Sequence, residues 1–260
     1  MRLARVFYAL RLAVEALDEY YDQVSKDQDV PKLVRDEPHP RFFPHITRFV
    51  EHCSLATERK WIEFEYIDVP RVDATNVTFI GQVKSSDRKL VIKFVGRYGV
   101  EAHDLLASKG MAPRLLYCGL LDGNSDVRHG ENSLARGGIK AGGLYVGPVR
   151  MVVMEYVEGS TLDKTPDPPE DTRTQIERAV RTLHDGQFVF GDLREPNIVI
   201  SGTKAYLIDF DWAGKEKEAR YPLHLSPNVN WPEEPRKLEL KPILVKHDLF
   251  MLDQLFPIED

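Results

Sequence analysis

Two polar residues at one edge of a predicted strand hairpin are the side chains of this chain best suited to metal chemistry. Residues 197–200 and 205–208 are apolar runs separated by Ser-Gly-Thr-Lys, a composition typical of a tight turn. Antiparallel pairing of the two runs brings Asn197 and Asp209 to the same edge of the hairpin. Amide and carboxylate oxygens are ligands that Mg²⁺ prefers, with water and phosphate oxygens as its other ligands. Asp192, in a loop just upstream, is then available to act as a base.

Lys93 lies inside the apolar run 90–95 (LVIKFV), which predicts a buried strand. A lysine in the middle of such a run either points outward or meets a buried anion. Taken singly, these residues have structural interpretations: an outward lysine, a turn cap for Asn197 and a strand-end hydrogen bond for Asp209. Their occurrence together, with Asp192, favours a shared site.

Apolar periodicity predicts the elements that must position these side chains. Period-two alternation and short apolar runs predict strands at 62–67, 77–83, 89–95, 112–119 and 151–157. Helical spacing and start signals predict helices at 98–107, 167–184 and 244–256. The buried face of the second of these helices is predicted to carry Ile176, Ala179, Val180 and Leu183.

The composition is that of an ordinary globular protein and limits the possible partners. The chain has 260 residues, enough for one large or two modest domains, with 42% hydrophobic and 29% charged residues. A formal net charge of −6 gives no reason to expect nucleic acid or an anionic membrane as the main partner. Cys53 and Cys118 have no disulfide or metal-ligand spacing, which indicates a reducing compartment. The expectation is a soluble intracellular protein.

Residues 2–24 form a predicted amphipathic helix. Arg11 and Glu15 interrupt the apolar core that a secretory signal needs, and the acidic residues argue against a mitochondrial presequence. No stretch of the chain approaches the roughly 20 apolar residues of a membrane-spanning helix. Two roles remain open for the helix: packing against the strand-rich part of the chain, or docking a partner. The proline-containing segment 27–44 is predicted to be an irregular connector.

The motif D-x-x-x-x-N, followed by a hairpin and D-F-x, resembles the catalytic loop and metal-binding segment of the protein-kinase-like fold. With VIKFVGRYGVEAH, GDLREPNIVI and LIDFDWAGKEKEARYP, the chain is similar over about 61–256 to compact kinase-like domains that are numerous in fungal genomes. The resemblance implies a two-lobed α+β fold with ATP and Mg²⁺ as cofactors. It further implies an N-terminal extension and connector over 1–60, a β-rich N-lobe over 61–157 with an insertion at 122–147, and a truncated, mainly helical C-lobe over 158–260.

The resemblance assigns roles to residues of the N-lobe. Lys93 corresponds to the strand lysine that contacts the nucleotide phosphates. Glu101 is the first choice for the glutamate that holds this lysine by an ion pair, with His103 or Asp104 as alternatives and a simple helix N-terminal preference as another.

The adenine is expected to lie against the passage that leaves the last N-lobe strand. Glu155 and Val157 would supply backbone hydrogen bonds, and Met154 would lie behind the base. The glycine-rich phosphate loop of kinases has no counterpart between residues 66 and 82, so a different turn, at 72–76, would have to cover the phosphates.

The catalytic loop departs from protein kinases in ways that resemble aminoglycoside and choline phosphotransferases. Gly191 precedes Asp192, and Asp211 stands where protein kinases have glycine. Asp211 is a candidate additional metal ligand. Arg194 is expected near the transferred phosphate, although a surface position is the structural alternative. Asp248 matches the aspartate that braces the catalytic loop in kinases.

The resemblance therefore predicts an ATP-dependent phosphotransferase, with a serine or threonine of a protein as the first choice of acceptor. A small-molecule kinase of the aminoglycoside or choline type is the alternative. A catalytically silent nucleotide-binding scaffold is a third hypothesis, because the glycine-rich loop is missing and the C-lobe is short.

Overall fold

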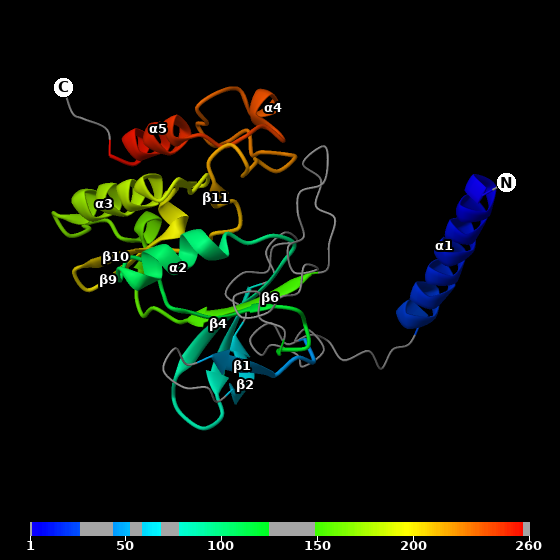
Figure 1. The fold of residues 1–260 in the computed structure, drawn as a ribbon. Coiled ribbons are helices and arrows are strands. Elements are labelled where there is room, and N and C mark those ends of the chain that lie inside the picture. Colours follow the sequence, from blue (N-terminus) through cyan, green and yellow to red (C-terminus); the bar gives the residue numbers. More distant parts are fainter. Residues whose placement is uncertain (1, 27–43, 53–58, 69–77, 125–148, 257–260) are drawn as a thin grey trace. The chain divides into compact units, whose positions relative to one another are not determined.

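The computed structural model describes residues 2–26, 44–52, 59–68, 78–124 and 149–256 (Figure 1). The chain divides into two compact units, residues 1–43 and residues 44–260. The first unit contains helix α1 (Arg2–Lys26), which confirms the predicted amphipathic helix. No helix in the described ranges is both long enough and apolar enough to cross a bilayer. The predicted connector at 27–44 and the phosphate-covering turn at 72–76 lie outside the described residues, except for Pro44.

The second unit begins with a sheet that, in its described part, has six strands in the order β1-β2-β3-β4-β6-β5. All neighbouring strands are antiparallel. Strands β5 and β6 are buried almost throughout, whereas β3 and β4 also carry partly exposed positions. The strands are β1 (Arg48–His52), β2 (Arg59–Asp68), β3 (Thr78–Val83), β4 (Lys89–Val95), β5 (Leu115–Gly119) and β6 (Arg150–Glu155).

The sheet starts further upstream than the predicted boundary at residue 60. Strand β1 pairs with β2 along five residues, from Arg48–Glu63 to His52–Arg59. Phe49 is fully buried, and its ring lies 6.2 Å from that of Phe64 and 6.1 Å from that of Tyr117. Burial of this aromatic side chain makes β1 part of the sheet, a contact that sequence periodicity over five residues does not reveal.

The remainder of the second unit combines helices with short strands and long connecting segments, and together with the sheet it confirms the predicted α+β class (Figure 1). Helix α2 (Val100–Ser108) and helix α5 (Val245–Leu255) both contact helix α3 (Thr172–Asp185). A hairpin of β9 (Ile198–Ser201) and β10 (Lys204–Leu207) is followed by the short helix α4 (Pro235–Leu238). The minor elements are β7 (Ser160–Thr161), β8 (Phe188–Val189), β11 (Gly214–Lys215) and the 3₁₀ turns η3 (Leu162–Lys164) and η4 (Glu195–Asn197).

Helix α3 begins five residues later than the predicted start at Asp167. Pro168 and Pro169 disfavour helical backbone in the residues before them, so the helix starts at Thr172, after Asp171. Its predicted buried face is confirmed, with Ile176, Ala179, Val180 and Leu183 all buried.

Candidate functional site

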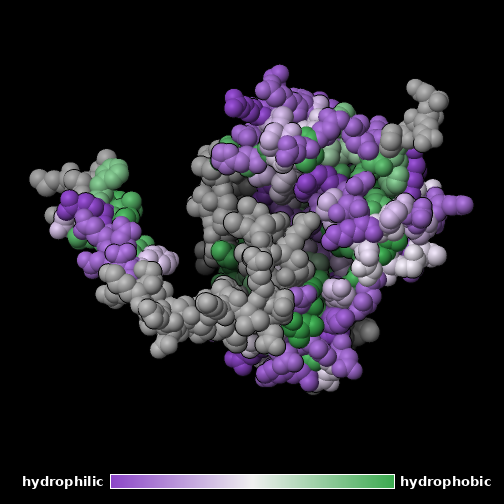
Figure 2. All heavy atoms as spheres, turned by 180° about the vertical axis from the view of Figure 1, so that it is seen from behind, coloured by the Kyte–Doolittle hydropathy of each residue, from purple (hydrophilic) through white to green (hydrophobic). Residues whose placement is uncertain are grey.

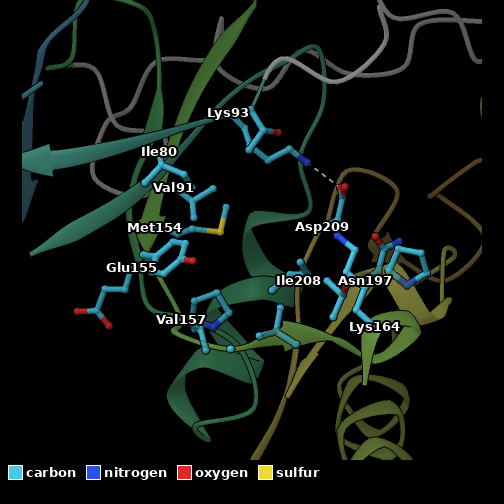
Figure 3. A pocket seen from close by; sticks show the side chains of 17 residues that line it. Ile80, Val91, Lys93, Met154, Glu155, Val157, Lys164, Asn197, Ile208 and Asp209 are labelled. Atoms are coloured by element: carbon cyan, nitrogen blue, oxygen red, sulfur yellow. Dashed lines mark hydrogen bonds and ion pairs between the residues drawn. The ribbon is translucent and has the colours of Figure 1, made fainter. Parts of the chain in front are cut away.

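A cavity of about 280 Å³ lies between the six-stranded sheet and the β9–β10 hairpin (Figure 3). This volume is near the lower end of the range for small-molecule sites. One end is polar and the rest is mainly apolar. The cavity is lined by Thr78, Ile80, Val91, Lys93, Pro113, Met154, Glu155, Tyr156, Val157, Gly159, Thr161, Lys164, Pro196, Asn197, Val199, Ile208 and Asp209.

Apolar residues from both sides line the body of the cavity. Ile80 and Val91 are cross-strand partners on β3 and β4, so their side chains share the face of the sheet that also carries Lys93, two residues after Val91. Val199 and Ile208 line it from the hairpin (Figure 3). Apolar groups on both sides suit a flat aromatic ring. None of these four residues was predicted from the sequence, although Val91 lies two residues from Lys93 and Val199 two residues from Asn197, a spacing that places each pair on one face of its predicted strand.

The three residues predicted to contact adenine all line this cavity. The backbone N–H of Glu155 donates to the carbonyl of Arg114 at 3.0 Å, and its carboxylate contacts the guanidinium of Arg114. By contrast, the backbone N–H of Val157 donates to no acceptor within the described part of the chain. This donor at the cavity wall remains available to a ligand. Met154 is 3% exposed and also lines the cavity.

Lys93 forms the centre of the polar end. Its ammonium group lies 2.8 Å from Oδ1 of Asp209 (dashed in Figure 3) and 2.9 Å from Oδ1 of Asp211. The side chain is 7% exposed. Burial alone would lower the pKa of Lys93, but the two carboxylates outweigh it and raise the pKa above its usual value. The lysine is therefore buried against two carboxylates whose own side chains are 27% and 22% exposed, and it does not point outward, the other possibility open from the sequence.

Glu101 does not pair with Lys93, and this expectation from the resemblance is corrected. Glu101 is exposed in the first turn of α2, whose buried face carries Ala102, His103 and Leu106. His103, one of the two alternatives, stacks on Phe210 at 4.4 Å and is hydrogen-bonded to the hydroxyl of Tyr98. Asp209 and Asp211, which follow β10, therefore pair with Lys93 in place of the glutamate expected on α2.

The catalytic loop brings Asp192, Arg194 and Asn197 together. Nη2 of Arg194 donates to Oδ2 of Asp192 at 2.8 Å, and Nε donates to Oδ1. Nδ2 of Asn197 donates both to the carboxylate and to the backbone carbonyl of Asp192, each at 2.9 Å. Burial raises the pKa of Asp192 above its usual value, while Arg194 acts in the opposite direction. Arg194 is consequently an ion-pair partner of the candidate base, and its guanidinium lies 5.8 Å from the ring of Trp231.

Asp248 on α5 holds the backbone of the loop that precedes Asp192, as the resemblance suggested. Its carboxylate accepts hydrogen bonds from the backbone N–H groups of Phe190 and Gly191, both at 2.8 Å, and contacts Nε2 of His184 at 3.0 Å. Gly191 has φ +85°, and a Cβ there would lie 2.6 Å from Cδ1 of Ile243. The positive φ and the lack of space for a Cβ both explain why glycine precedes Asp192.

We expect Asp248→Ala to destabilise the fold by about 3 kcal/mol, because it leaves two buried backbone N–H groups unpaired. The free energy of unfolding, measured by denaturant titration, checks this. Asp253→Ala changes an exposed aspartate on the same helix and should have little effect. Equal stability of the two variants would contradict the bracing role.

The two carboxylates beside Lys93 have different acidities. Burial, and then the neighbouring charge of Asp209, raises the pKa of Asp211 to about 7 despite the contact with Lys93. For Asp209, burial acts to raise the pKa, but Lys93 outweighs it and the pKa is lowered. Asp209 also has φ +68°, an unusual backbone conformation for a residue other than glycine.

This raised pKa predicts a pH dependence for the nucleotide-free, metal-free protein. The unfolded chain loses the Asp211 proton near its ordinary pKa of about 4, whereas the folded chain holds it to about pH 7. The folded state therefore binds more protons in this interval, and the contribution of Asp211 to stability falls as pH rises through it. Asp211→Asn should remove this fall, measured as the difference in unfolding free energy from wild type at about pH 5 and about pH 8. Glu101→Gln, at an exposed carboxylate, should leave the pH dependence unchanged.

The oxygen donors of the site fit a hard divalent cation. Asn197 and Asp209 line the same cavity. Nδ2 of Asn197 is engaged with Asp192, and no described residue donates to its Oδ1. In the described residues, no group of three or more His, Cys, Asp or Glu side chains gathers as a metal site. The amide oxygen of Asn197 and the carboxylate of Asp209 are donors of the kind that Mg²⁺ accepts alongside water and phosphate oxygens.

The matching family model is described as lipopolysaccharide core biosynthesis protein (WaaY), and it covers residues 143–230, about a third of the chain. This segment includes Asp192, Asn197 and Asp209. Among solved structures, that of vaccinia related kinase 3 is similar with 12% sequence identity and a TM-score of 0.45, covering 81% of this chain and 66% of that one. This chain thus spans just under two thirds of that structure. No curated protein shows a significant match. The candidate base and metal ligands therefore lie in the part of the chain that is similar to a lipopolysaccharide core biosynthesis family.

Proposed function

We propose that this protein transfers the terminal phosphoryl group of ATP to a hydroxyl group of a non-protein acceptor. The proposal is supported by one observation, the position of the candidate base next to the polar end of the cavity. A cavity with apolar walls and a free backbone donor at Val157 ends in Lys93, Asp209 and Asn197, and Asn197 is hydrogen-bonded to the buried carboxylate of Asp192. A nucleotide lying along the cavity would have its phosphates at the polar end, next to the candidate base.

Each residue has a defined task in this reaction. Asp192 accepts the proton of the acceptor hydroxyl as its oxygen forms a bond to the γ-phosphorus. The bond from that phosphorus to the bridging oxygen breaks, and ADP leaves with the electron pair. Lys93 neutralises negative charge on the phosphates, and Arg194 orients the carboxylate of Asp192.

Mg²⁺, held by Asn197 and Asp209, would neutralise charge on the phosphate oxygens when bound. Asp211 contacts the ammonium of Lys93 at 2.9 Å, and this ion pair would hold the lysine in place when Asp209 binds the metal.

The family match favours a non-protein acceptor over the protein serine or threonine that was the first choice from the sequence. Its description, lipopolysaccharide core biosynthesis, points to a saccharide hydroxyl. Gly191 stands where protein kinases have arginine, so an activation-loop phosphate would have no cation to pair with at that position, and control by that route is not part of the proposal.

A radiolabelled-phosphate transfer assay on an acceptor panel tests the proposal. The panel contains lipopolysaccharide core oligosaccharide, free sugars, an aminoglycoside, choline, and casein as a protein acceptor. Label on a saccharide or other small molecule, lost in Asp192→Asn, is the expected result. Label on casein alone would overturn the acceptor class. Nucleotide binding without transfer to any acceptor, including water, would favour the silent scaffold.

A further inference from the structure

Helix α1 carries a heptad repeat of large apolar residues, with further apolar side chains outside the repeat at Val6, Tyr8, Leu12 and Tyr20. Large apolar residues occur at alternating intervals of four and three along the helix, at positions 3, 7, 10, 14, 17, 21 and 24. A period of 3.5 residues is the pattern of a coiled-coil seam. We call the described residues of this stripe the α1 seam: Phe7, Leu10, Val14, Leu17 and Tyr21.

Within the first unit, no described residue covers the α1 seam. Its side chains are between 51% and 64% accessible, and Figure 2 shows hydrophobic residues on the surface of this helix beside hydrophilic ones. Five large apolar side chains on one stripe of a helix mark an interaction surface, because their transfer out of water is favourable.

The charges of α1 run against the dipole of the helix. Acidic residues are favoured at a helix N-terminus and basic residues at its C-terminus. Here the first half carries Arg2, Arg5 and Arg11, and no acidic residue stands in the first turn. The second half carries Glu15, Asp18, Glu19 and Asp22 against a single basic residue, Lys26. This arrangement is unfavourable for a single helix. It becomes favourable beside a second helix of the same sequence that runs in the opposite direction.

We propose that α1 pairs with α1 of a second copy of this chain as an antiparallel two-helix coiled coil. With Val14 opposite Leu17 of the second copy, and Leu10 opposite its Tyr21, the seam forms continuous apolar layers. The same register places Arg11 beside Asp18 of the second copy. Two-fold symmetry repeats this ion pair, so the helix is complementary to itself.

Other contacts of Arg11 are compatible with this pairing. Its Nε lies 3.4 Å from Glu15 in the same helix, and the two side chains are 67% and 56% exposed. The guanidinium therefore remains accessible at the edge of the seam. A parallel arrangement would instead bring the two basic halves together and the two acidic halves together, which is repulsive.

Sedimentation velocity of the full chain over a concentration series tests for the pair. The wild type should dimerise in the micromolar range. Leu10→Glu combined with Leu17→Glu should be monomeric, with unchanged thermal unfolding of the second unit. A wild type that stays monomeric, or a dimer that survives this double substitution, would overturn the proposal.

Charge exchange tests the antiparallel register and distinguishes it from a general loss of helix. Asp18→Arg and Arg11→Asp each convert two attractive contacts into repulsive ones, so each should weaken dimerisation about tenfold. An equimolar mixture of the two variants should dimerise as tightly as the wild type, because the mixed pair has both attractions restored. Glu19→Arg makes the same change of charge away from the seam and should dimerise normally. No recovery in the mixture, or an equal loss with Glu19→Arg, would refute the register.

Discussion

Asp192→Asn is expected to reduce phosphoryl transfer about a thousandfold while nucleotide affinity stays close to that of the wild type. The asparagine can still hydrogen-bond in the loop, but it cannot accept the acceptor proton at pH 7. Asp192 does not line the nucleotide cavity, so the loss should fall on kcat rather than on the KM for ATP. Single-turnover transfer to the best acceptor of the panel, with ATP binding followed by thermal shift, measures both quantities.

The matched control for this variant is Asp253→Asn, at an exposed aspartate on α5. It should transfer phosphate at the wild-type rate. A rate for Asp192→Asn within about tenfold of wild type would exclude Asp192 as the base, because a general base contributes at least 10²-fold. Loss of ATP binding in the same variant would instead assign Asp192 to the nucleotide site.

Lys93→Met is expected to weaken ATP binding and to destabilise the fold by roughly 2–4 kcal/mol. The methionine fills a similar volume, but it leaves the partly buried carboxylates of Asp209 and Asp211 beside each other without a cation. Proton uptake by Asp211, whose pKa is already about 7, should relieve part of this cost, so the loss of stability should be smaller at lower pH. Unfolding free energies at about pH 6 and about pH 8 measure the effect.

The double variant Lys93→Met, Asp211→Asn separates the two roles of the lysine. Removal of one carboxylate should restore much of the lost stability, since a single acid then remains beside a neutral amide. ATP binding should not return, because no cation faces the phosphates. Lys89→Met, on the same strand but in an exposed pair with Glu158, is the control and should change neither property. Unchanged stability in Lys93→Met would show that the ammonium contributes nothing to the fold, and restored ATP binding in the double variant would contradict its phosphate role.

The sequence identified the hairpin and its register because the information is local. Two apolar runs flanking a glycine-containing turn have few alternative pairings, and the observed pair Ala205–Ile200 is the expected one. The positions of Asn197 and Asp209 at one edge follow directly from that register. The role of Asp248 in holding the backbone of Phe190 and Gly191 is not local information. Only the resemblance to a known fold suggests it.

The ion-pair partners of Lys93 could not be predicted from the sequence. Glu101 was preferred because it follows the strand lysine on a helix, but the orientation of α2 decides which of its residues face the site. The backbone N–H of Gly99 donates to the carbonyl of Phe210 at 2.9 Å, and His103 stacks on the ring of Phe210. These contacts fix the helix with Glu101 toward solvent, and they join residues more than 100 positions apart in the chain.

The sequence by itself determined the longer helices and strands around the site, the order of the polar motifs and the edge at which Asn197 and Asp209 emerge, because each depends on residues close together in the chain. Only the tertiary structure decided that β1 joins the sheet, that Ile80 and Val91 face Val199 and Ile208 across a cavity, and that Asp211 rather than Glu101 holds Lys93. Those outcomes depend on how separate elements pack, and packing is set by the shapes and charges of side chains that are distant in sequence.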